Sequence, residues 1–309
     1  MGGSLPRLLF ALIAFVASAM AVLTGCGSCG CGRCTEKEPN ISVFAAFIRN
    51  TARQRNVSLA EAADMLYDLG VRGFDVGPDD KDLPELAATK LKPINFYVFP
   101  RMFNEADCAA DCKRCLDQAE KYGVPRVMVV PSHFTEGGDQ EAEFAKDMAG
   151  MKMFVREAKK RGITITVEDF GGRQNPGSYA KYLKRFLDEI PDIRFALDSG
   201  NLYYANRGED ILDMMGYAKG RIAHIHLKDQ YPENHRKYQT LGLGGVPNEK
   251  IVKAMDAAGS DGWYTLENAV PGADTYTEAV RQVAVLKSWL ARGRGPEKGL
   301  PATTATASR

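Results

Sequence analysis

Four short apolar segments decide the fold: Ile163-Thr-Ile-Thr-Val-Glu-Asp169, Phe195-Ala-Leu-Asp198, Ile222-Ala-His-Ile-His-Leu-Lys-Asp229 and Tyr264-Thr-Leu-Glu267. Each is rich in residues that favour β-strands, and each carries a side chain able to bind a metal at or near its end. These side chains are Glu168, Asp198, His226 and Glu267, and they are 30, 28 and 41 residues apart. A strand and its crossover helix need about 30 residues, so each gap accommodates one such unit. The segments therefore predict four successive parallel strands that each place one potential ligand at the carboxyl end.

The rest of the chain continues the same alternation of strands and helices. Further strands are expected at residues 41–47, 71–76, 91–99 and 127–130. Helices are expected at 58–69, 105–122, 142–161, 178–189, 209–217, 248–258 and 275–291. Ser58 and Glu61 form a capping-box pattern, and Gly70, Gly123 and Gly162 follow helices as C-terminal stops. Eight such units predict a single-domain (β/α)8 TIM barrel over residues 41–292, with the active site at the carboxyl ends of the strands.

The two ends of the chain differ in composition from the predicted barrel. Residues 8–23 carry no charge and follow Arg7, which is typical of the apolar region of a signal peptide. The run ends Val22-Leu-Thr-Gly-Cys26, which resembles the lipobox of bacterial lipoproteins. We therefore predict a signal peptide at 1–25, a lipidated Cys26, a linker at 26–40 and a disordered tail at 293–309. The protein is then expected to be exported and tethered to the membrane as a periplasmic or cell-surface lipoprotein. An uncleaved anchor and a plain export signal are the alternatives.

The seven cysteines form two groups. Cys26, Cys29, Cys31 and Cys34 lie in a glycine-rich stretch, where a lipidated cysteine followed by a tether is favoured over a zinc or iron–sulfur site. The second group shares one face of the expected helix at 105–122, where packing thiols or a local disulfide are favoured over a metal site. Its members are Cys108, Cys112 and Cys115.

Composition limits the class of partner. The 309 residues are 45% hydrophobic and 26% charged, with a net charge of +1 and no basic block. A protein that binds a phosphate backbone normally presents a basic face, so nucleic acid is not expected as a partner. Apurinic endonuclease chemistry needs a histidine-rich zinc cluster, which four histidines do not provide. A small, roughly neutral molecule is the expected substrate.

The four strand-end side chains indicate the chemistry. Three carboxylates and one imidazole suit one divalent cation, Mn2+ or Mg2+ first and Co2+ or Zn2+ next. Such an ion polarises a carbonyl oxygen, while Glu168 and Glu267 can remove and return a proton at the neighbouring carbon. Any one of these acids alone could be a helix cap or an ion-pair partner. Their occurrence in order on four consecutive strands favours a metal-dependent sugar isomerase or epimerase that works through an enediolate.

The motifs around these positions resemble the xylose-isomerase-like TIM-barrel superfamily, and within it the sugar phosphate isomerase/epimerase family. The resemblance covers residues 41–292 and is carried by Val167-Glu-Asp169, Asp198-Ser-Gly-Asn201, His226-Leu-Lys-Asp229 and Leu266-Glu-Asn268. It implies a divalent metal held by Glu168, Asp198, His226 and Glu267, with Glu168 and Glu267 as the acid/base pair.

The same resemblance suggests residues that contact the substrate. Many relatives have a histidine where this chain has Asn201, whose amide could still hydrogen-bond a hydroxyl group. Lys228 and Asp229 match the family's H-x-K-D pattern, in which these residues shape the site or the strand end. The alternative is that they form a solvated ion pair in a loop. Position alone, not the resemblance, adds His133 after the fourth strand and His235 with Arg236 in the long loop after the seventh, although lone loop residues are more often simply exposed. The substrate-binding candidates are then Asn201, His133, Lys228, Asp229, His235 and Arg236.

Two other functions remain open at this point. A lyase or dehydratase acting on a keto-sugar or inositol derivative begins with the same proton abstraction. A non-catalytic surface lipoprotein that binds carbohydrate would not need two opposed glutamates. Export makes an unphosphorylated sugar the better expectation, and an oligomer is possible.

Overall fold

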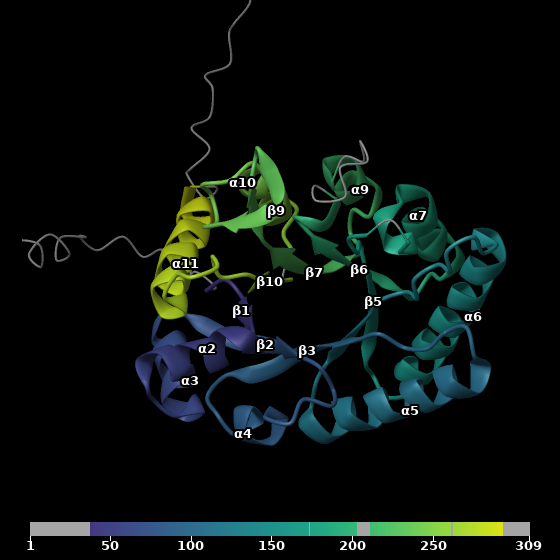
Figure 1. Cartoon of the computed structure of the whole chain (residues 1–309), viewed down its shortest axis with the longest axis horizontal. Coiled ribbons are helices and arrows are strands. Elements are labelled where there is room, and N and C mark those ends of the chain that lie inside the picture. The colour runs from purple at the N-terminus through teal and green to yellow at the C-terminus, as the bar shows by residue number, and fades with distance from the viewer. Residues whose placement is uncertain (1–37, 173, 203–210, 261, 293–309) are drawn as a thin grey trace, which may run out of the picture. The chain divides into compact units, whose positions relative to one another are not determined.

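Eight parallel strands close into a barrel in the computed structural model, which describes residues 38–292 except 173, 203–210 and 261 (Figure 1). Around the ring the order is β1, β10, β7, β6, β5, β4, β3 and β2, and β1 pairs with both of its neighbours. This confirms the predicted single-domain TIM barrel. The strands are β1 (Ile41–Phe44), β2 (Val71–Val76), β3 (Lys92–Val98), β4 (Arg126–Val129), β5 (Thr164–Glu168), β6 (Arg194–Asp198), β7 (Ile222–Leu227) and β10 (Trp263–Leu266).

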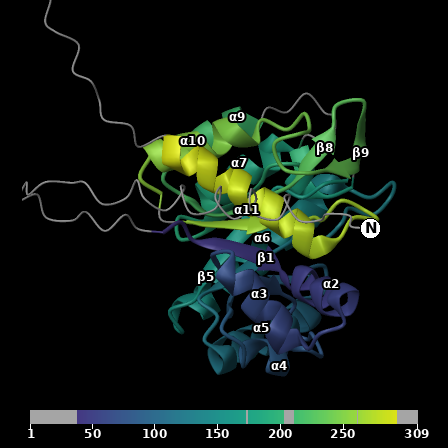
Figure 2. The ribbon, with the colours of Figure 1, turned by 90° about the vertical axis from the view of Figure 1, so that its left-hand side faces the viewer.

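Helices surround the ring on its outside, as the two ribbon views show (Figures 1 and 2). Their ends follow local sequence signals. Ser58 and Glu61 form the predicted capping box of α3, and α5 ends at Gly123 with a φ of 66°, a conformation that glycine adopts without strain. The helices are α2 (Ala45–Arg55), α3 (Leu59–Asp68), α4 (Leu83–Ala87), α5 (Glu105–Tyr122), α6 (Gln140–Lys159), α7 (Ala180–Glu189), α9 (Ile211–Tyr217), α10 (Asn248–Ala257) and α11 (Thr275–Arg292), with a short 3-10 turn at Pro176–Ser178.

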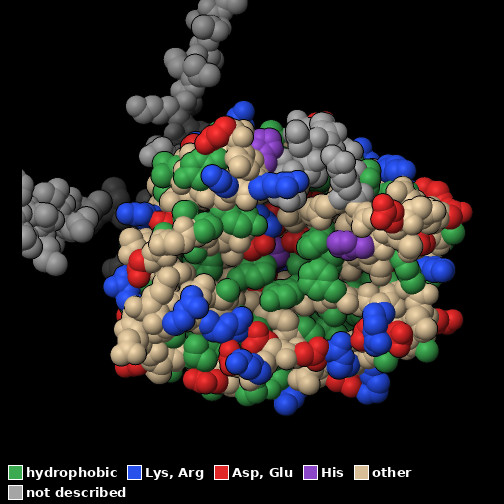
Figure 3. Space-filling view, in the orientation of Figure 1, with side chains coloured by type: hydrophobic (Ala, Val, Ile, Leu, Met, Phe, Trp, Pro, Cys, Tyr) green, Lys and Arg blue, Asp and Glu red, His purple; other side chains and the backbone are tan. Residues whose placement is uncertain are grey.

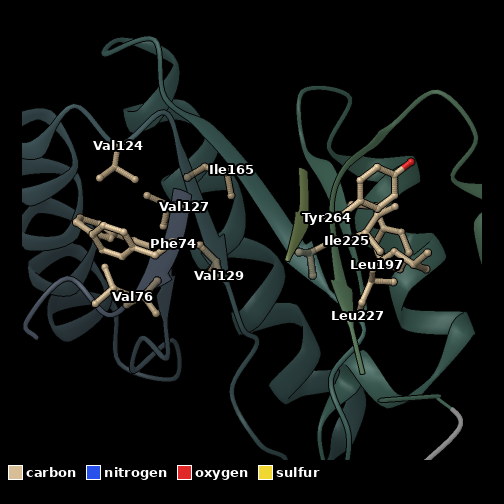
Figure 4. Close-up of a cluster of buried hydrophobic side chains, with 14 of the residues drawn as sticks. Phe74, Val76, Val124, Val127, Val129, Ile165, Leu197, Ile225, Leu227 and Tyr264 are labelled. Atoms are coloured by element: carbon tan, nitrogen blue, oxygen red, sulfur yellow. The ribbon is translucent and has the colours of Figure 1, made fainter. Parts of the chain in front are cut away.

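Alternation along the strands separates an apolar outer layer from a polar interior. On β7, His224 and His226 share one face, and Ile225 and Leu227 share the other. Ile225 and Leu227 belong to the buried hydrophobic cluster beneath the helices, together with Leu197 (Figure 4). The interior holds polar side chains such as these histidines, together with a small apolar cluster that includes Met128 and Ala196.

The structure corrects the sequence prediction at three places. Residues 45–47, expected to extend the first strand, begin helix α2, because Ala45, Ile48 and Ala52 form a buried helical stripe. Helix α4 was not predicted, since its five residues give too short a pattern. The loop expected after the seventh strand contains an antiparallel hairpin, β8 (Asp229–Tyr231) and β9 (Asn234–Gln239), whose largely polar residues carry little strand signal.

The predicted features at the two ends lie outside the described residues. These are the signal peptide, Cys26 and its three neighbouring cysteines, most of the linker, and the tail from residue 293. The three cysteines of α5 are buried free thiols, and burial raises the pKa of Cys112 and of Cys115 to about 12. They act as packing side chains. Within the described part of the chain, no helix is both long and apolar enough to cross a membrane.

A buried carboxyl group on α6 gives the first testable prediction. Asp147 Oδ1 accepts a hydrogen bond from the Ser132 backbone N–H at 3.0 Å, and Oδ2 accepts none from the described residues. Burial raises the pKa of Asp147 to about 7. Because the folded-state pKa lies above the unfolded-state value, the wild type loses stability as the pH rises from about 4 to 7. Asp147→Asn removes this loss and is expected to stabilise the protein at pH 8 by at most about 4 kcal/mol.

Denaturant titration at pH 5 and pH 8 measures this effect. Asp68→Asn, at an exposed position on α3, is the matched control and should leave the pH dependence unchanged. An Asp147→Asn protein with the same pH dependence as the wild type would contradict the prediction.

Candidate metal centre

The barrel brings the four predicted ligands together. Glu168 and Asp198 are the last residues of β5 and β6, His226 lies on β7, and Glu267 follows β10 directly. These strands are neighbours in the ring, so their carboxyl ends converge on one face. Each residue offers a ligand atom, and all four atoms lie within 4.8 Å of one another. Figure 3 shows a central hollow in which acidic and histidine side chains lie deep among hydrophobic ones.

His226 stands at the centre of this cluster. Its Nδ1 lies 2.7 Å from Glu168 Oε1, 3.4 Å from Glu267 Oε2 and 3.9 Å from Asp198 Oδ2. Glu168 and Asp198 are buried, whereas the Glu267 side chain keeps 19% of its surface exposed. Glu267 is therefore the most exposed acid of the cluster, while Glu168 is buried, and both lie beside the same ring nitrogen of His226.

Burial and mutual repulsion shift the pKa values of the cluster. Burial raises the pKa of Glu168, although His226 opposes the shift. Burial also raises the pKa of Asp198 to about 7; the charge of Lys228 counteracts this shift and the charge of Glu267 adds to it. Burial alone would lower the pKa of His226, but hydrogen bonds to two carboxylates hold it well above the usual value. The carboxylates are thus buried close together, and positive charge between them is needed to offset their mutual repulsion.

The residues present fit a divalent cation. Glu267 Oε2 is a buried atom that accepts no hydrogen bond from any described residue. A buried oxygen without a partner is costly, and a cation would satisfy it. Oxygen-rich sets with one imidazole suit Mn2+ or Mg2+, with Co2+ or Zn2+ also possible. Glu168, Asp198, His226 and Glu267 are the residues that would hold the ion.

A second buried group supports His226 from inside the barrel. Asp75, on β2, has its Oδ2 atom 3.1 Å from His226 Nε2 and 2.9 Å from His224 Nε2. Asn95 on β3 donates to the same oxygen at 2.8 Å. Asp75 was not among the residues predicted from the sequence, because its only local signal is one acid in an apolar strand.

The hydrogen-bond partners fix the tautomer of His224 and the role of Nε2 in His226. Arg126 can only donate, so its contact of 3.1 Å makes His224 Nδ1 an acceptor and leaves the proton on Nε2, facing Asp75. Burial lowers the pKa of His224 to about 4, so this imidazole is neutral. Asp75 likewise accepts from His226 Nε2, so Nδ1, which lies 2.7 Å from Glu168 Oε1, is the nitrogen that could bind a cation after giving up its proton.

Asp75, His224 and His226 also form a possible ligand set by proximity. Their separations are those of hydrogen bonds, and Thr265 Oγ1 lies 2.9 Å from His224 Nε2. Every atom facing Asp75 Oδ2 is a donor in this arrangement. We therefore assign this group to the support of His226.

The support role predicts the effect of Asp75→Asn. The amide keeps the shape but removes the charge that orients the His226 Nε2–H, so affinity for Mn2+ is expected to fall about 10- to 100-fold. Titration calorimetry on the metal-free protein measures the change. Asp80→Asn, which breaks an ion pair with Arg49 outside the barrel core, is the control. Equal affinities of Asp75→Asn and wild type would contradict the role.

Lys228 and Asn201, predicted as substrate contacts, join the cluster through bonds to protein groups. Lys228 Nζ lies 2.8 Å from Asp198 Oδ2 and 2.7 Å from Glu267 Oε1, and it donates to Asn201 Oδ1 at 3.2 Å. Asn201 Nδ2 donates to the carbonyl of Asp169 at 2.7 Å. Both side chains therefore bind protein groups.

Asp229, another predicted substrate contact, binds backbone groups of its own chain. Its carboxylate accepts backbone N–H groups from Gln230 and from the loop at 242–246. A Cβ at Gly244 would collide with this carboxylate, so the close approach requires glycine there. Asp229 therefore organises this loop, and its role as a substrate contact stays a prediction.

The three remaining candidates lie on loops or on the hairpin. His133 is exposed after β4, with its ring 6.1 Å from that of Phe170. His235 and Arg236 lie on β9, where His235 Nε2 is 3.1 Å from the carbonyl of Pro232 and the Arg236 backbone N–H donates to Asn234. None of the three belongs to the four-residue cluster. Their role as substrate contacts stays a prediction.

An aromatic wall faces the mouth beside the ligands. Phe44 packs against His226 at 5.0 Å between ring centroids and stacks on Tyr97 at 5.4 Å. The contacts continue from Tyr97 to Phe99 and from Phe99 to Phe170. Phe99 is 57% exposed, which is unusual for so apolar a side chain. Ligand sites combine such apolar walls with a few placed polar groups.

A cavity of about 1030 Å³ lies at the opposite end of the barrel. Its lining includes the first residues of β4, β5, β6, β7 and β10. In TIM barrels the chemistry takes place at the carboxyl ends of the strands, so this cavity is not the candidate site.

Fold and cluster together define a parallel α/β barrel with a ligand set at its carboxyl face. The sequence model of the xylose isomerase-like TIM barrel family matches residues 60–289, and the chain belongs to this family. This confirms the resemblance drawn from the sequence motifs.

Individual relatives include dehydratases and epimerases. The chain is 29% identical over 103 residues to the inosose dehydratase of Geobacillus thermodenitrificans (strain NG80-2), a match that covers 28% of this chain and 34% of that protein. The chain thus matches about a third of that relative's length. The probable 3-DHS dehydratase of petrobactin synthesis from Bacillus anthracis has a similar structure, with a TM-score of 0.65 at 14% identity, over 80% of this chain and 98% of that one. An L-ribulose 3-epimerase gives a TM-score of 0.66 at 16% identity, over 83% and 96%.

Proposed function

We propose that the protein is a divalent-metal-dependent sugar isomerase or epimerase. The observation that carries the proposal is the set of Glu168, Asp198, His226 and Glu267 at the carboxyl face, with one oxygen of each glutamate close to His226 Nδ1. The family and the epimerase among the structural relatives support a sugar-modifying enzyme. A bound cation would polarise the substrate's carbonyl group and lower the cost of removing a proton beside it.

The protein's own groups would carry the proton. Glu168 lies in a buried environment that raises its pKa, which suits a group that must both take and release a proton near neutral pH. Glu267 lies nearer the mouth and can serve the opposite face of the same carbon. One glutamate would remove the proton to form an enediolate, and the other would return it.

The aromatic wall supports a carbohydrate as the substrate. Phe44, Tyr97, Phe99 and Phe170 present apolar surface beside the ligand set, and Phe44 packs on His226. The C–H face of a sugar can pack on such a wall while its hydroxyl groups turn to the polar side. The predicted export of the protein favours an unphosphorylated sugar.

A dehydratase acting on a keto-sugar or inositol derivative is the second candidate. The partial match to an inosose dehydratase favours it. The reaction begins with the same proton abstraction, but the carbanion then expels a neighbouring hydroxyl group as water.

One experiment separates the two candidates. Ketoses, aldoses and inososes are incubated with the enzyme and Mn2+, Mg2+ or Co2+ in D2O, and the products are analysed by mass spectrometry and NMR. Isomerisation or epimerisation gives a product with the same atoms as the substrate, except that deuterium replaces hydrogen at the reacting carbon. Dehydration gives a product that lacks one water. Absence of exchange and of product with every substrate and metal would refute both.

A further inference from the structure

The ammonium group of Lys228 lies among the side chains assigned to the cation. Its three nearest oxygens are Asp198 Oδ2 at 2.8 Å, Glu267 Oε1 at 2.7 Å and Asn201 Oδ1 at 3.2 Å. An ammonium group has three N–H donors, so the three acceptors match its capacity. The side chain is 7% exposed. Two of its partners are members of the four-residue ligand set.

The path of this side chain is built into the fold. Ser199 Oγ lies 3.1 Å from both the backbone nitrogen and the carbonyl oxygen of Lys228, and Asn248 Nδ2 donates to the same carbonyl. The aliphatic stem then passes Gly200, where an added Cβ would lie 2.6 Å from Lys228 Cγ and 3.0 Å from Cδ. Glycine at this position leaves the space for the stem. The position of the Lys228 side chain therefore depends on the absence of a side chain at residue 200.

Charge explains why a cation is needed there. Glu168, Asp198 and Glu267 place three carboxylates so that their ligand atoms lie within 4.8 Å of one another, in a buried site. Like charges at this distance repel strongly where water is excluded. A lysine ammonium is a compact point charge and can substitute for an ion between two carboxylates.

We propose that Lys228 is a placeholder cation. In the metal-free protein its ammonium group neutralises Asp198 and Glu267 and holds the ligands assembled, and an arriving divalent ion has to compete with it for these oxygens. The protein then folds stably without the ion and binds it less tightly than the ligand set alone would allow. This inference rests on the metal site of the proposed function, but not on the reaction.

A thermodynamic cycle tests the placeholder role. Lys228→Met keeps an apolar stem and removes the charge, so it should lower the melting temperature of the metal-free protein. It should also raise the affinity for Mn2+ by about 10- to 100-fold, the range of a typical coupling between two sites. The measurements are thermal unfolding of the metal-free protein and calorimetric titration with Mn2+. Lys253→Met, which removes an exposed lysine of α10, is the matched control.

A purely structural lysine gives a different result. It would destabilise the metal-free and metal-loaded forms equally and leave the affinity unchanged, and that outcome would overturn the proposal. Weaker binding in Lys228→Met, or no binding of Mn2+ to either protein, would also overturn it. Lys228→Gln, which keeps hydrogen-bonding capacity without charge, gives the same comparison if the methionine variant does not fold. Metal binding without turnover would count against the proposed function and leave this inference intact.

Discussion

Glu168→Gln and Glu267→Gln are each expected to lower kcat by about 10²- to 10⁴-fold, the usual contribution of a general acid or base. Glutamine keeps the size and one oxygen of the side chain but cannot accept and return a proton. Since both residues also belong to the ligand set, kcat is measured at saturating Mn2+ with the metal content of each variant determined in parallel. The variants should show the far-UV circular dichroism of the wild type.

Glu249→Gln is the control for these variants. Glu249 lies on α10 with an exposed side chain that pairs with Lys253, away from the ligand set. Its kcat should match that of the wild type. Full turnover by both Glu168→Gln and Glu267→Gln with metal bound would show that neither glutamate transfers the proton.

The double variant Asp198→Ala, His226→Ala is expected to lose the metal completely. The wild type should retain one divalent ion per chain after dialysis, because four ligand atoms converge within 4.8 Å. Removing two of the four leaves two carboxylates that cannot hold the ion against water. Elemental analysis by mass spectrometry of the dialysed proteins measures the stoichiometry.

The control pairs His235→Ala with Asp68→Ala, which removes the same two residue types outside the cluster. It should retain the ion. A double variant at Asp198 and His226 that still held one ion per chain would place the metal elsewhere. A wild type that bound no ion even after loading would refute metal dependence altogether.

The strands and the four-residue cluster could be predicted from the sequence because their signals are local. Each apolar segment that ends in a polar residue predicts a strand and identifies its carboxyl end. The number of residues between successive segments predicts a crossover helix in each gap. The helix at 105–122 was predicted with the bounds that α5 has in the structure, since Gly123 marks its end.

Asp75 and Lys228 show where this reasoning stops. Asp75 contacts a histidine 151 residues further along the chain, and only closure of the ring brings β2 opposite β7. Lys228 follows a motif histidine by two residues, which suggested a contact with substrate. Its actual partners, Asp198 and Glu267, depend on the direction of the stem past Gly200. Spacing along one chain does not contain this information.

The pairing of β1 with β10 has a consequence for folding. This seam joins residues that are far apart in the chain, as the hydrogen bond of 2.6 Å between Ser42 and Thr265 shows. Contacts of such long range form late in folding. The chain loses conformational entropy when the two ends are brought together, before the contacts between them contribute any stabilisation. Glu267 follows β10 directly, so a nascent chain that has emerged through β7 carries three of the four ligands and an incomplete ring. Tight binding of the ion would therefore mark the moment at which the barrel has closed.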